Sequence, residues 1–380
     1  MTKKSHHIKE VFLLFLKLGC IAFGGPAAHI SMMEEEVVTK RKWMSRQYFL
    51  DMVGATNLVP GPNSTQMTMH CGHKKGGVLG LFVAGVSFIF PAVTITGVLA
   101  WLYTTYGKLP EVTPFIYGIK PAVLVIIAMA ILKLGKKAVK SVELAILGIL
   151  IIIATFLGFN EITVLLLGGI IGAIYFYIKN SHQTKALSFS PIFLLKLPVI
   201  TITKITTTSS VFWSFLKVGA ILYGSGYVLF AYLDAELVAN EIISRQELID
   251  AIAIGQLTPG PVLSTATFIG FQINGVWGAI AATIGIFLPS FIFVMLLNPL
   301  VDKMRQSKIL SYFLDAVNVA AVAIMIVVLI KMSYTTLISY KEILILIVSI
   351  LLTLKVKKMS SMWLVPIGSV LGYILTLIVL

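Results

Sequence analysis

Helix-breaking residues interrupt the long apolar stretches of this sequence at four places. Two lie in the N-terminal half and two in the C-terminal half: Gly24-Gly25-Pro26, Pro60-Gly61-Pro62, Gly224-Ser225-Gly226 and Pro259-Gly260-Pro261. Proline is favoured at the first position of a helix, so Pro26, Pro62 and Pro261 are predicted to open new helix segments. The N-terminus of a helix presents unpaired N–H groups and a partial positive charge, which suit an anion. The breaks are therefore candidate anion-binding elements.

Neutral hydrogen-bonding residues follow both Pro-Gly-Pro motifs. They are Asn63, Ser64, Thr65 and Gln66 in the first half, and Ser264 with Thr265 in the second. Hydroxyl and amide groups suit the oxygens of an oxyanion, and nothing there suits a soft metal or an apolar ligand. One such motif alone would be interpreted as a turn at the membrane surface. Two at matching positions favour a substrate site, for which we predict no metal and no cofactor.

Two lysines lie inside apolar stretches. Lys17 and Lys217 each precede a glycine break by seven positions. An ionisable group at membrane depth is costly and indicates a function. The alternative is that both side chains extend to the membrane surface, as lysine readily does. We predict that the two lysines help to balance a divalent anion.

Seven titratable residues are candidates for coupling or gating. Three pairs match between the halves and one residue follows the first break: Glu36 and Glu236, Asp51 and Asp250, Arg46 and Arg245, and His29. The acidic residues and the histidine could carry protons, although a position at a loop edge would equally explain the aspartates. Each arginine follows an N-capping serine, so we expect it to gate or stabilise the fold and not to contact the anion.

These residues recur because the chain contains one unit twice. Residues 15–26 match 215–226, and residues 45–62 match 244–261 with 8 identities in 18 positions, where unrelated sequences would share about one. The predicted organisation is a first membrane repeat, a linker and a second membrane repeat, at residues 1–180, 181–209 and 210–380.

The composition indicates an all-α polytopic membrane protein. The chain has 380 residues, of which 58% are hydrophobic and 12% are charged, and apolar stretches of about 20 residues recur along it. The net charge of +14 could indicate nucleic acid. However, the basic residues lie mostly in short loops, as membrane orientation requires, so no nucleic-acid partner is expected. No phosphate-binding loop is found, so direct ATP drive is not expected. We also predict that the protein is not an enzyme.

The Pro-Gly-Pro segments decide the topology. Each segment either crosses as a broken helix, giving six crossings per half, or dips into the bilayer and returns, giving five. Outside the apolar segments there are 27 basic residues; five crossings divide them 20 to 7 between the two faces, and six crossings divide them 15 to 12. The positive-inside rule therefore favours inverted repeats with re-entrant elements. The basic N-terminus fits this topology if the first element is itself a hairpin broken at Gly24-Gly25-Pro26.

These motifs resemble the chromate ion transporter superfamily in its long, two-domain form. The resemblance rests on Phe23-Gly24-Gly25-Pro26 with His29, and on the run Trp43, Phe49, Pro60-Gly61-Pro62, Gln66 and Gly72. It implies a protein of the cytoplasmic membrane that exports chromate by a secondary mechanism using the proton gradient. By resemblance, the positions that handle substrate are Gly24, Gly25 and Pro26, together with Pro60, Gly61, Pro62, Asn63 and Gln66.

The second copy departs from the family pattern. Ser225-Gly226 replaces Gly-Pro, and Val262-Leu263 replaces Asn-Ser. We therefore predict that the first copy carries the binding specificity. The sequence leaves open a permease for another tetrahedral oxyanion such as sulfate, an uncoupled anion channel, and a membrane sensor that transports nothing. It is also compatible with a homodimer.

Overall fold

The computed structural model describes residues 3–23, 25–56, 59–107, 109, 111–180, 207–223, 226–297, 307–355 and 361–377, in which every regular element is helical. The first half contains α1 (Lys3–Ile21), α2 (Pro26–Glu34), the π-helix η1 (Glu35–Lys40), α3 (Arg46–Thr56), α4 (Asn63–Tyr106), α5 (Thr113–Ala138), α6 (Val142–Phe156) and α7 (Glu161–Asn180). The second half contains α8 (Thr208–Ile221), η4 (Gly226–Val228), α9 (Leu229–Leu233), η5 (Asp234–Val238), α10 (Arg245–Leu257), η6 (Val262–Ser264), α11 (Thr265–Leu297), α13 (Lys308–Thr336), α14 (Tyr340–Lys355) and α15 (Ser361–Leu377).

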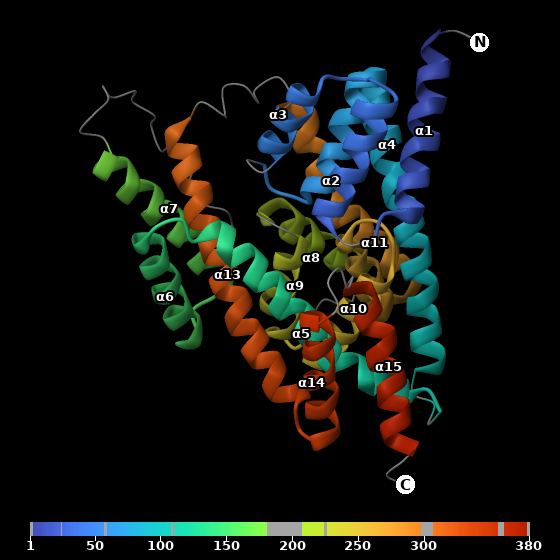
Figure 1. Cartoon of the computed structure of the whole chain (residues 1–380), viewed down its shortest axis with the longest axis vertical. Helices are drawn as coiled ribbons and strands as arrows, with labels where there is room; N and C mark the ends of the chain where they lie inside the picture. The colour runs from blue at the N-terminus through green and yellow to red at the C-terminus, as the bar shows by residue number, and fades with distance from the viewer. Residues whose placement is uncertain are drawn as a thin grey trace.

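Both halves begin with broken helices, as the sequence predicts. The apolar stretch 11–32 is divided into α1 and α2, and the stretch 211–232 is divided at the end of α8. The helix α3 has 11 residues and is therefore about 16 Å long, about half of what a bilayer crossing needs. Figure 1 places α2 and α3 toward the end of the molecule that holds the N-terminus, while the C-terminus lies at the opposite end.

The helix α4 is two helices joined by a reversal. Gly77 has non-helical dihedral angles, with φ at 64°. A Cβ atom placed on Gly72 would lie 2.3 Å from the carbonyl oxygen of Gly80, although eight residues of a straight helix would separate these positions by about 12 Å. The chain therefore folds back at Gly77, and the segment after Pro62 returns before the long crossing begins. Gly270 and Gly278 repeat this contact in α11, on either side of Gly275.

The two halves interlock through their later helices. The helix α5 packs against α13, α14 and α15, and α13 packs against α5, α6 and α7. Glycine allows this close approach, since a Cβ atom on Gly118 of α5 would lie 2.1 Å from the carbonyl oxygen of Gly368 in α15. Small residues at such crossings are typical of helix association in membranes. Each half therefore completes its packing with helices of the other.

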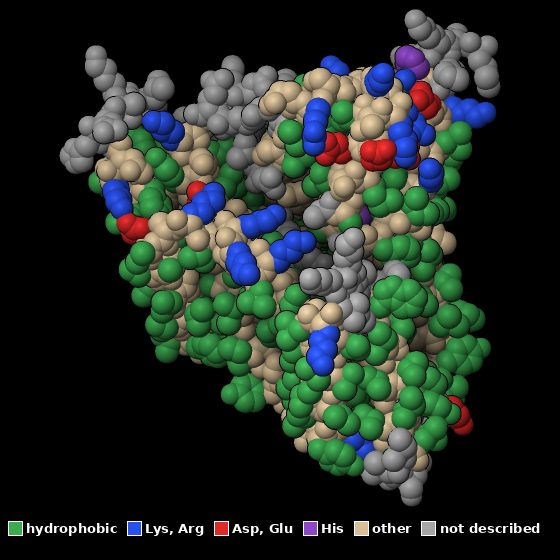
Figure 2. Space-filling view, in the orientation of Figure 1, with side chains coloured by type: hydrophobic (Ala, Val, Ile, Leu, Met, Phe, Trp, Pro, Cys, Tyr) green, Lys and Arg blue, Asp and Glu red, His purple; other side chains and the backbone are tan. Residues whose placement is uncertain are grey.

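The outer surface suits a bilayer. Five helices, α4, α5, α7, α11 with the short helix before it, and α13, are long and apolar enough to cross a membrane. Many of their large apolar side chains are exposed, among them Phe90, Leu132 and Ile171. Figure 2 shows hydrophobic side chains over much of the visible face, with most lysine and arginine side chains in its upper part. The inverted orientation of the two repeats and their predicted boundaries stay predictions.

Candidate functional site

Each Pro-Gly-Pro loop contacts the glycine break of the other half. The Gly61 N–H donates to the carbonyl of Leu222 at 2.6 Å, and the Gly260 N–H donates to the carbonyl of Ala22 at 2.9 Å. Ala22 and Leu222 are equivalent positions, each two residues before a predicted break. These reciprocal bonds bring the flanks of all four breaks together. Gly24, Gly224 and Ser225 themselves lie outside the described residues.

The central glycine of each loop has a conformation that other residues rarely adopt. Gly61 has φ at 122° and Gly260 has φ at 84°. A Cβ atom on Gly61 would lie 2.4 Å from Ser290 Oγ of α11, and one on Gly260 would lie 3.0 Å from Ala92 Cβ of α4. Ser290 and Ala92 both directly follow the prolines inside their helices, Pro289 and Pro91. Each loop therefore rests against the long helix of the opposite half.

Three helix segments start beside these contacts without a side-chain cap. The helix α2 begins at Pro26, as predicted, while α4 and η6 begin one residue after Pro62 and Pro261. The residue before each start, Gly25, Pro62 or Pro261, provides no side-chain hydrogen bond to the first N–H groups. The first N–H groups of a helix have no partner within it, so such starts can receive an anion.

The neutral residues after the loops are buried, but they are satisfied differently in the two halves. Ser64, Thr65 and Gln66 are at most 2% exposed, as is Ser264, and Asn63 is half-buried. Thr65 Oγ1 is buried without a hydrogen-bond partner among the described residues, and so is Ser290 Oγ. In the second half, Ser264 Oγ lies 3.3 Å from Thr258 Oγ1. The first loop therefore has two unpartnered hydroxyls near it, that of Thr65 from the first half and that of Ser290 from the second.

The side chain of Gln66 stabilises the turn of the first Pro-Gly-Pro loop. Its Nε2 donates to the carbonyl of Pro60 at 2.5 Å, and a Cβ atom on Gly61 would lie 2.6 Å from the same nitrogen. The side-chain amide therefore holds the Pro-Gly-Pro turn in shape with one of its donors. Its Oε1 is buried and has no partner among the described residues.

Both predicted lysines form ion pairs with predicted glutamates. Lys17 Nζ lies 3.5 Å from Glu36 Oε1, and Lys217 Nζ lies 2.7 Å from Glu236 Oε2. The lysine side chains are 57% and 45% exposed, whereas the glutamate side chains are 11% and 8% exposed. The structure therefore places each lysine beside a carboxylate, and an anion would have to compete with that partner. A direct contact with substrate stays a prediction for both lysines.

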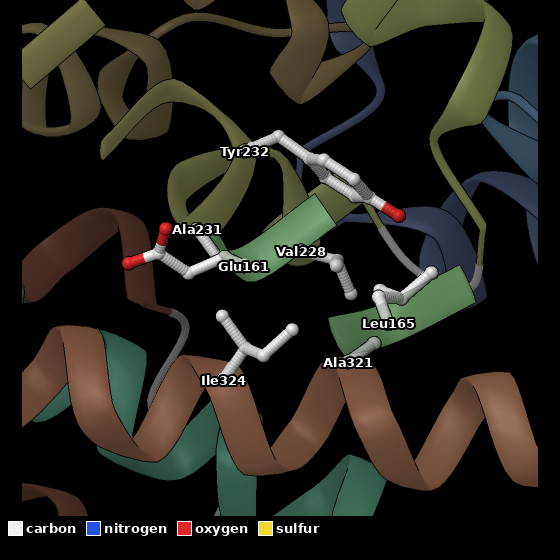
Figure 3. Close-up of a pocket in the computed structure, with 7 residues that line it drawn as sticks. All are labelled: Glu161, Leu165, Val228, Ala231, Tyr232, Ala321 and Ile324. Atoms are coloured by element: carbon white, nitrogen blue, oxygen red, sulfur yellow. The ribbon is translucent and has the colours of Figure 1, made fainter. Parts of the chain in front are cut away.

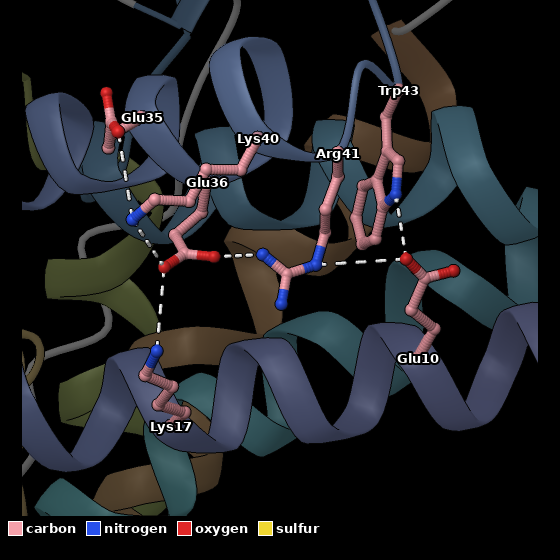
Figure 4. Close-up of polar contacts among 7 residues, drawn as sticks. All are labelled: Glu10, Lys17, Glu35, Glu36, Lys40, Arg41 and Trp43. Carbon is pink, nitrogen blue, oxygen red and sulfur yellow. Dashed lines mark hydrogen bonds and ion pairs between the residues drawn. The ribbon is translucent and has the colours of Figure 1, made fainter.

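The Glu36 carboxylate forms ion pairs with three cationic side chains (Figure 4). Its carboxylate pairs with Lys17, with Lys40 at 3.4 Å and with Arg41. Burial alone would raise the pKa of Glu36. Its pKa nevertheless lies below the ordinary value, because the ionised carboxylate is stabilised by hydrogen bonds from Arg41 and Lys40 and by the charges of Arg41 and Lys17. Glu36 is therefore ionised at neutral pH. It is better suited to holding η1 against α1 than to exchanging protons there.

The network in Figure 4 continues from Arg41 to Glu10 of α1. Arg41 Nε lies 3.8 Å from Glu10 Oε1, and the Trp43 indole N–H donates to the same oxygen at 3.2 Å. Lys75 of α4 pairs with Glu10 Oε2 at 3.0 Å. The start of α1 is therefore fixed to the loop before α3 and to the reversal in α4.

The two predicted arginines also pair in matching ways. Arg46 Nε lies 2.8 Å from Glu34 Oε1, and Arg245 Nε lies 3.0 Å from Asp234 Oδ1. Both contacts join the helix that leads to a Pro-Gly-Pro loop to the segment that follows the glycine break. The Ser244 and Glu247 capping box, expected from the sequence, is present at the start of α10. The arginines thus hold the broken elements of each half together.

His29 is buried beside the first break. Its side chain is 1% exposed, and Nε2 donates to the carbonyl of Ala22 at 3.0 Å. The same carbonyl accepts the Gly260 N–H, so the histidine lies directly at the contact between the halves. In the second half the Tyr232 hydroxyl donates to the carbonyl of Ile221 at 2.8 Å, one residue before the carbonyl that accepts the Gly61 N–H.

Asp250 contacts the other half of the molecule. Its Oδ2 accepts a hydrogen bond from the Tyr103 hydroxyl at 2.6 Å and lies 3.7 Å from Lys120 Nζ. Asp51, its equivalent, is in α3, and its side chain lies outside the description. Sequence reasoning did not select Lys120, Tyr103 or Ser290. Lys120 had a signal, because it is a charge within an apolar stretch, but only the fold could pair it with Asp250.

A small cavity lies away from the loops (Figure 3). It is lined by Glu161, Leu165, Val228, Ala231, Tyr232, Ala321 and Ile324. Glu161 pairs with Lys331 at 3.1 Å, and the Tyr232 hydroxyl is bonded to a carbonyl. The polar groups of the lining are therefore engaged, and no predicted site residue lines this cavity.

Comparison with known proteins gives one family. The family model described as "Chromate transporter" matches twice, at residues 9–173 and 209–373. A probable chromate transport protein of Synechococcus elongatus is 31% identical over 325 residues, covering 83% of this chain and 82% of the relative. The chromate transport protein of Cupriavidus metallidurans is 27% identical over 380 residues, covering 98% and 94%. No solved structure matches the chain.

A shorter relative matches half of the chain. An uncharacterized transporter of Bacillus subtilis is 27% identical over 188 residues, which cover 48% of this chain and 94% of that protein. The twofold match of the family model and this half-length relative agree with the duplication seen in the sequence.

Proposed function

The chain belongs to the chromate transporter family, and from that premise we propose that it exports chromate across the cytoplasmic membrane, driven by the proton gradient. It is an integral multi-pass membrane protein with two copies of the family's unit. Two relatives that cover more than four fifths of its length carry chromate transport in their names. The direction and the coupling ion are part of the proposal.

The observation that carries the proposal is the reciprocal contact of the two Pro-Gly-Pro loops. The Gly61 and Gly260 N–H groups bond across the halves to Leu222 and Ala22, which brings the starts of α4 and η6 near the glycine breaks of the opposite halves. Helix starts favour a tetrahedral oxyanion because several N–H groups point at its oxygens. Broken helices at matching positions of two repeats are typical of a transporter's substrate site.

We place the anion nearer to the first copy. Pro60 and Asn63 are half-buried, whereas residues 258–264 of the second copy are all buried. The unpartnered hydroxyls of Thr65 and Ser290 lie beside the first loop or at the start of its helix. A small anion entering between the halves would therefore meet free donors at the first loop. Lys17 and Lys217 would contribute long-range positive charge, since each already pairs with a glutamate.

Chromate uptake into inside-out vesicles containing the purified protein tests this proposal. We expect uptake that saturates with chromate, that requires a proton gradient, and that a tenfold excess of sulfate leaves mostly unchanged. Flux that is independent of the gradient would indicate a channel and would contradict the coupling. Complete competition by sulfate would show a general oxyanion permease.

A matched pair of substitutions tests the position of the anion. Thr65→Val removes an unpartnered buried hydroxyl in the first copy, and Ser264→Ala removes the equivalent hydroxyl, which is already bonded to Thr258. If the first copy holds the anion, Thr65→Val raises the chromate concentration at half-maximal uptake about tenfold or more, because a hydrogen bond to a charged group contributes about 1.5–3 kcal/mol. Ser264→Ala leaves that concentration nearly unchanged. The opposite order would place the anion at the second copy.

A further inference from the structure

Asp250 is a buried carboxylate that is only half satisfied. Its side chain is 5% exposed. The Tyr103 hydroxyl donates to Oδ2 at 2.6 Å and Lys120 Nζ lies 3.7 Å from the same oxygen. Oδ1 is buried and has no partner among the described residues. A buried charge is retained only when partners compensate it, so the balance between ionised and neutral Asp250 depends on these two neighbours.

The three residues join the halves at a helix that leads to a break. Asp250 lies in α10 of the second half, whereas Tyr103 lies in α4 and Lys120 in α5 of the first. The helix α10 ends at Leu257, about 10 Å beyond Asp250 along the helix axis. There the second Pro-Gly-Pro loop begins, which is bonded through Gly260 to the first half. The helix is thus attached to the first half at two points, and Asp250 makes one of them.

The groups that favour the ionised form of Asp250 come from the first half of the chain. From the elements packed against α10, Lys120 of α5 and Tyr103 of α4 act on Asp250, and from its own helix Glu247 acts on it one turn away. Glu247 has the same charge as ionised Asp250 and opposes it. Moving α10 away from α4 and α5 would therefore leave a buried carboxylate without compensation, which favours binding of a proton.

We propose that Lys120, Asp250 and Tyr103 form the proton-coupling site, in which Asp250 binds a proton when its contacts with Lys120 and Tyr103 open. The proton adds to the carboxylate from the aqueous phase on one side and leaves as a proton toward the other, and no other bond changes. While ionised, Asp250 holds α10 and its Pro-Gly-Pro loop against the first half. Once neutral, it releases Lys120, and the loop is free to change its contacts with the anion.

This inference rests on the proposed function and assigns Lys120 a role beside Asp250. The pair does not recur in the other copy, since Asn318 of α13 stands where the pattern of α5 has Lys120. The duplicated protein would therefore have one such coupling site, and Asp250 would bind one proton in each transport cycle.

The chain offers a matched control. Lys331 of α13 pairs with Glu161 of α7 at 3.1 Å, and the glutamate is 8% exposed. This pair also joins a lysine to a buried carboxylate of the other half, but neither residue lies on a helix that leads directly to a Pro-Gly-Pro loop. The double variant K331M/E161Q therefore removes a similar ion pair without touching the proposed coupling site.

The test measures chromate and protons in the same vesicles. Radioactive chromate reports transport and exchange, and a trapped pH-sensitive dye reports proton movement. For Asp250→Asn and for K120M/D250N, we expect chromate exchange at equal concentrations to persist. Uptake with and without a proton gradient should become equal, and the chromate-dependent proton movement should be lost. Tyr103→Phe removes a donor to the ionised carboxylate, so the midpoint of the pH dependence of uptake should move to higher pH. K331M/E161Q should retain the stimulation by the gradient.

The outcomes separate this inference from the proposed function. If the unaltered protein does not move chromate, the proposed function is wrong. If it does, and K120M/D250N still accumulates chromate in response to the gradient, the coupling site is wrong while the proposed function stands. Loss of gradient stimulation in both double variants would also overturn the inference, because any buried pair between the halves would then be required. Size-exclusion chromatography identifies variants that misfold, and Tyr103→Phe provides a second, milder test.

Discussion

The first and second halves of this protein make the same two ion pairs in different surroundings. The lysine of the first helix pairs with a glutamate, Lys17 with Glu36 and Lys217 with Glu236. In the first half two further cations, Lys40 and Arg41, pair with that glutamate. The shared contacts maintain a common scaffold, and the added charges make the first half's surface more basic.

The arginine pairs differ more in burial. The Arg46 side chain is 75% exposed and its partner Glu34 is 27% exposed, whereas Arg245 is 26% exposed and its partner Asp234 only 2%. The loops follow the same trend, because Pro60 and Asn63 are half-buried and residues 258–264 are all buried. The first copy is therefore more exposed than the second at its loop and at its arginine pair. An open first copy for ligand and a packed second copy for structure would follow from this difference.

The largest expected effect comes from the central glycines of the loops. Gly61→Ala places a Cβ atom against Ser290 Oγ and Gln66 Nε2, and Gly260→Ala places one against Ala92 Cβ. Both also occupy a left-handed conformation that costs about 1–3 kcal/mol for a residue with a side chain. We expect Gly61→Ala to abolish chromate uptake and Gly260→Ala to reduce it mainly by lowering the amount of folded protein.

Uptake per folded molecule measures this difference. Fluorescence-detected size-exclusion chromatography gives the folded fraction, against which the initial rate is normalised. Gly54→Ala is the control, because nothing lies within 4 Å of the Cβ atom that it adds. Equal normalised rates for Gly61→Ala and Gly260→Ala would contradict the proposal that the anion binds at the first copy.

The arginine pairs predict the next largest difference. Arg245→Ala leaves the buried Asp234 carboxylate without its cation and should cost about 3 kcal/mol of stability, at the lower end for a buried pair. Arg46→Ala disturbs an exposed pair and should cost about 0–1 kcal/mol. Melting temperatures of the two variants in the same detergent test this order. A larger loss for Arg46→Ala would mean that the first half is the more tightly packed copy.

Glu36 and Glu236 predict a smaller difference. Glu36→Gln leaves three cations without their shared carboxylate, whereas Glu236→Gln leaves one among the described residues, Lys217. Hydrogen bonds to charged groups each contribute about 1.5–3 kcal/mol when buried, but the lysines here are half-exposed and their share is smaller. We therefore expect a decrease in melting temperature that is larger for Glu36→Gln by a few degrees. If raising the salt concentration does not reduce that difference, it does not come from the cations.

The sequence was sufficient to predict the helical class, the duplication and the broken helices. Proline and glycine at matched positions have a local effect on the chain, so Pro26 and Gly61 could be placed without the fold. The helix start at Ser244 was also local, and its capping box is present. Matched charges such as Lys17 and Glu36 were recognised, but the pattern alone did not show that they pair with each other.

Contacts between the halves could not be predicted in this way. The bond from Gly61 to Leu222 joins residues 161 positions apart, and the bond from Tyr103 to Asp250 joins residues 147 positions apart. Backbone carbonyls such as that of Leu222 carry no residue-specific signal. Ser290 follows a proline in an apolar helix, and only the approach of Gly61 makes it part of the site. The differences that separate the two copies are therefore tertiary, although their common elements are local.

The smallest expected effect is the pH dependence that Glu36 gives to the first half. The cations around Glu36 hold its pKa below the ordinary value. A carboxyl group whose pKa is lower in the folded state stabilises the fold above its unfolded pKa, and this contribution is lost as the pH falls through the folded pKa. Acid should therefore lower the melting temperature, and Glu36→Gln should reduce the slope of that decrease. Glu35→Gln is the control, because the Glu35 side chain is 55% exposed and its ion pair among the described residues is the one with Lys40 at 3.7 Å. An unchanged slope in Glu36→Gln would mean that other carboxylates cause the acid sensitivity.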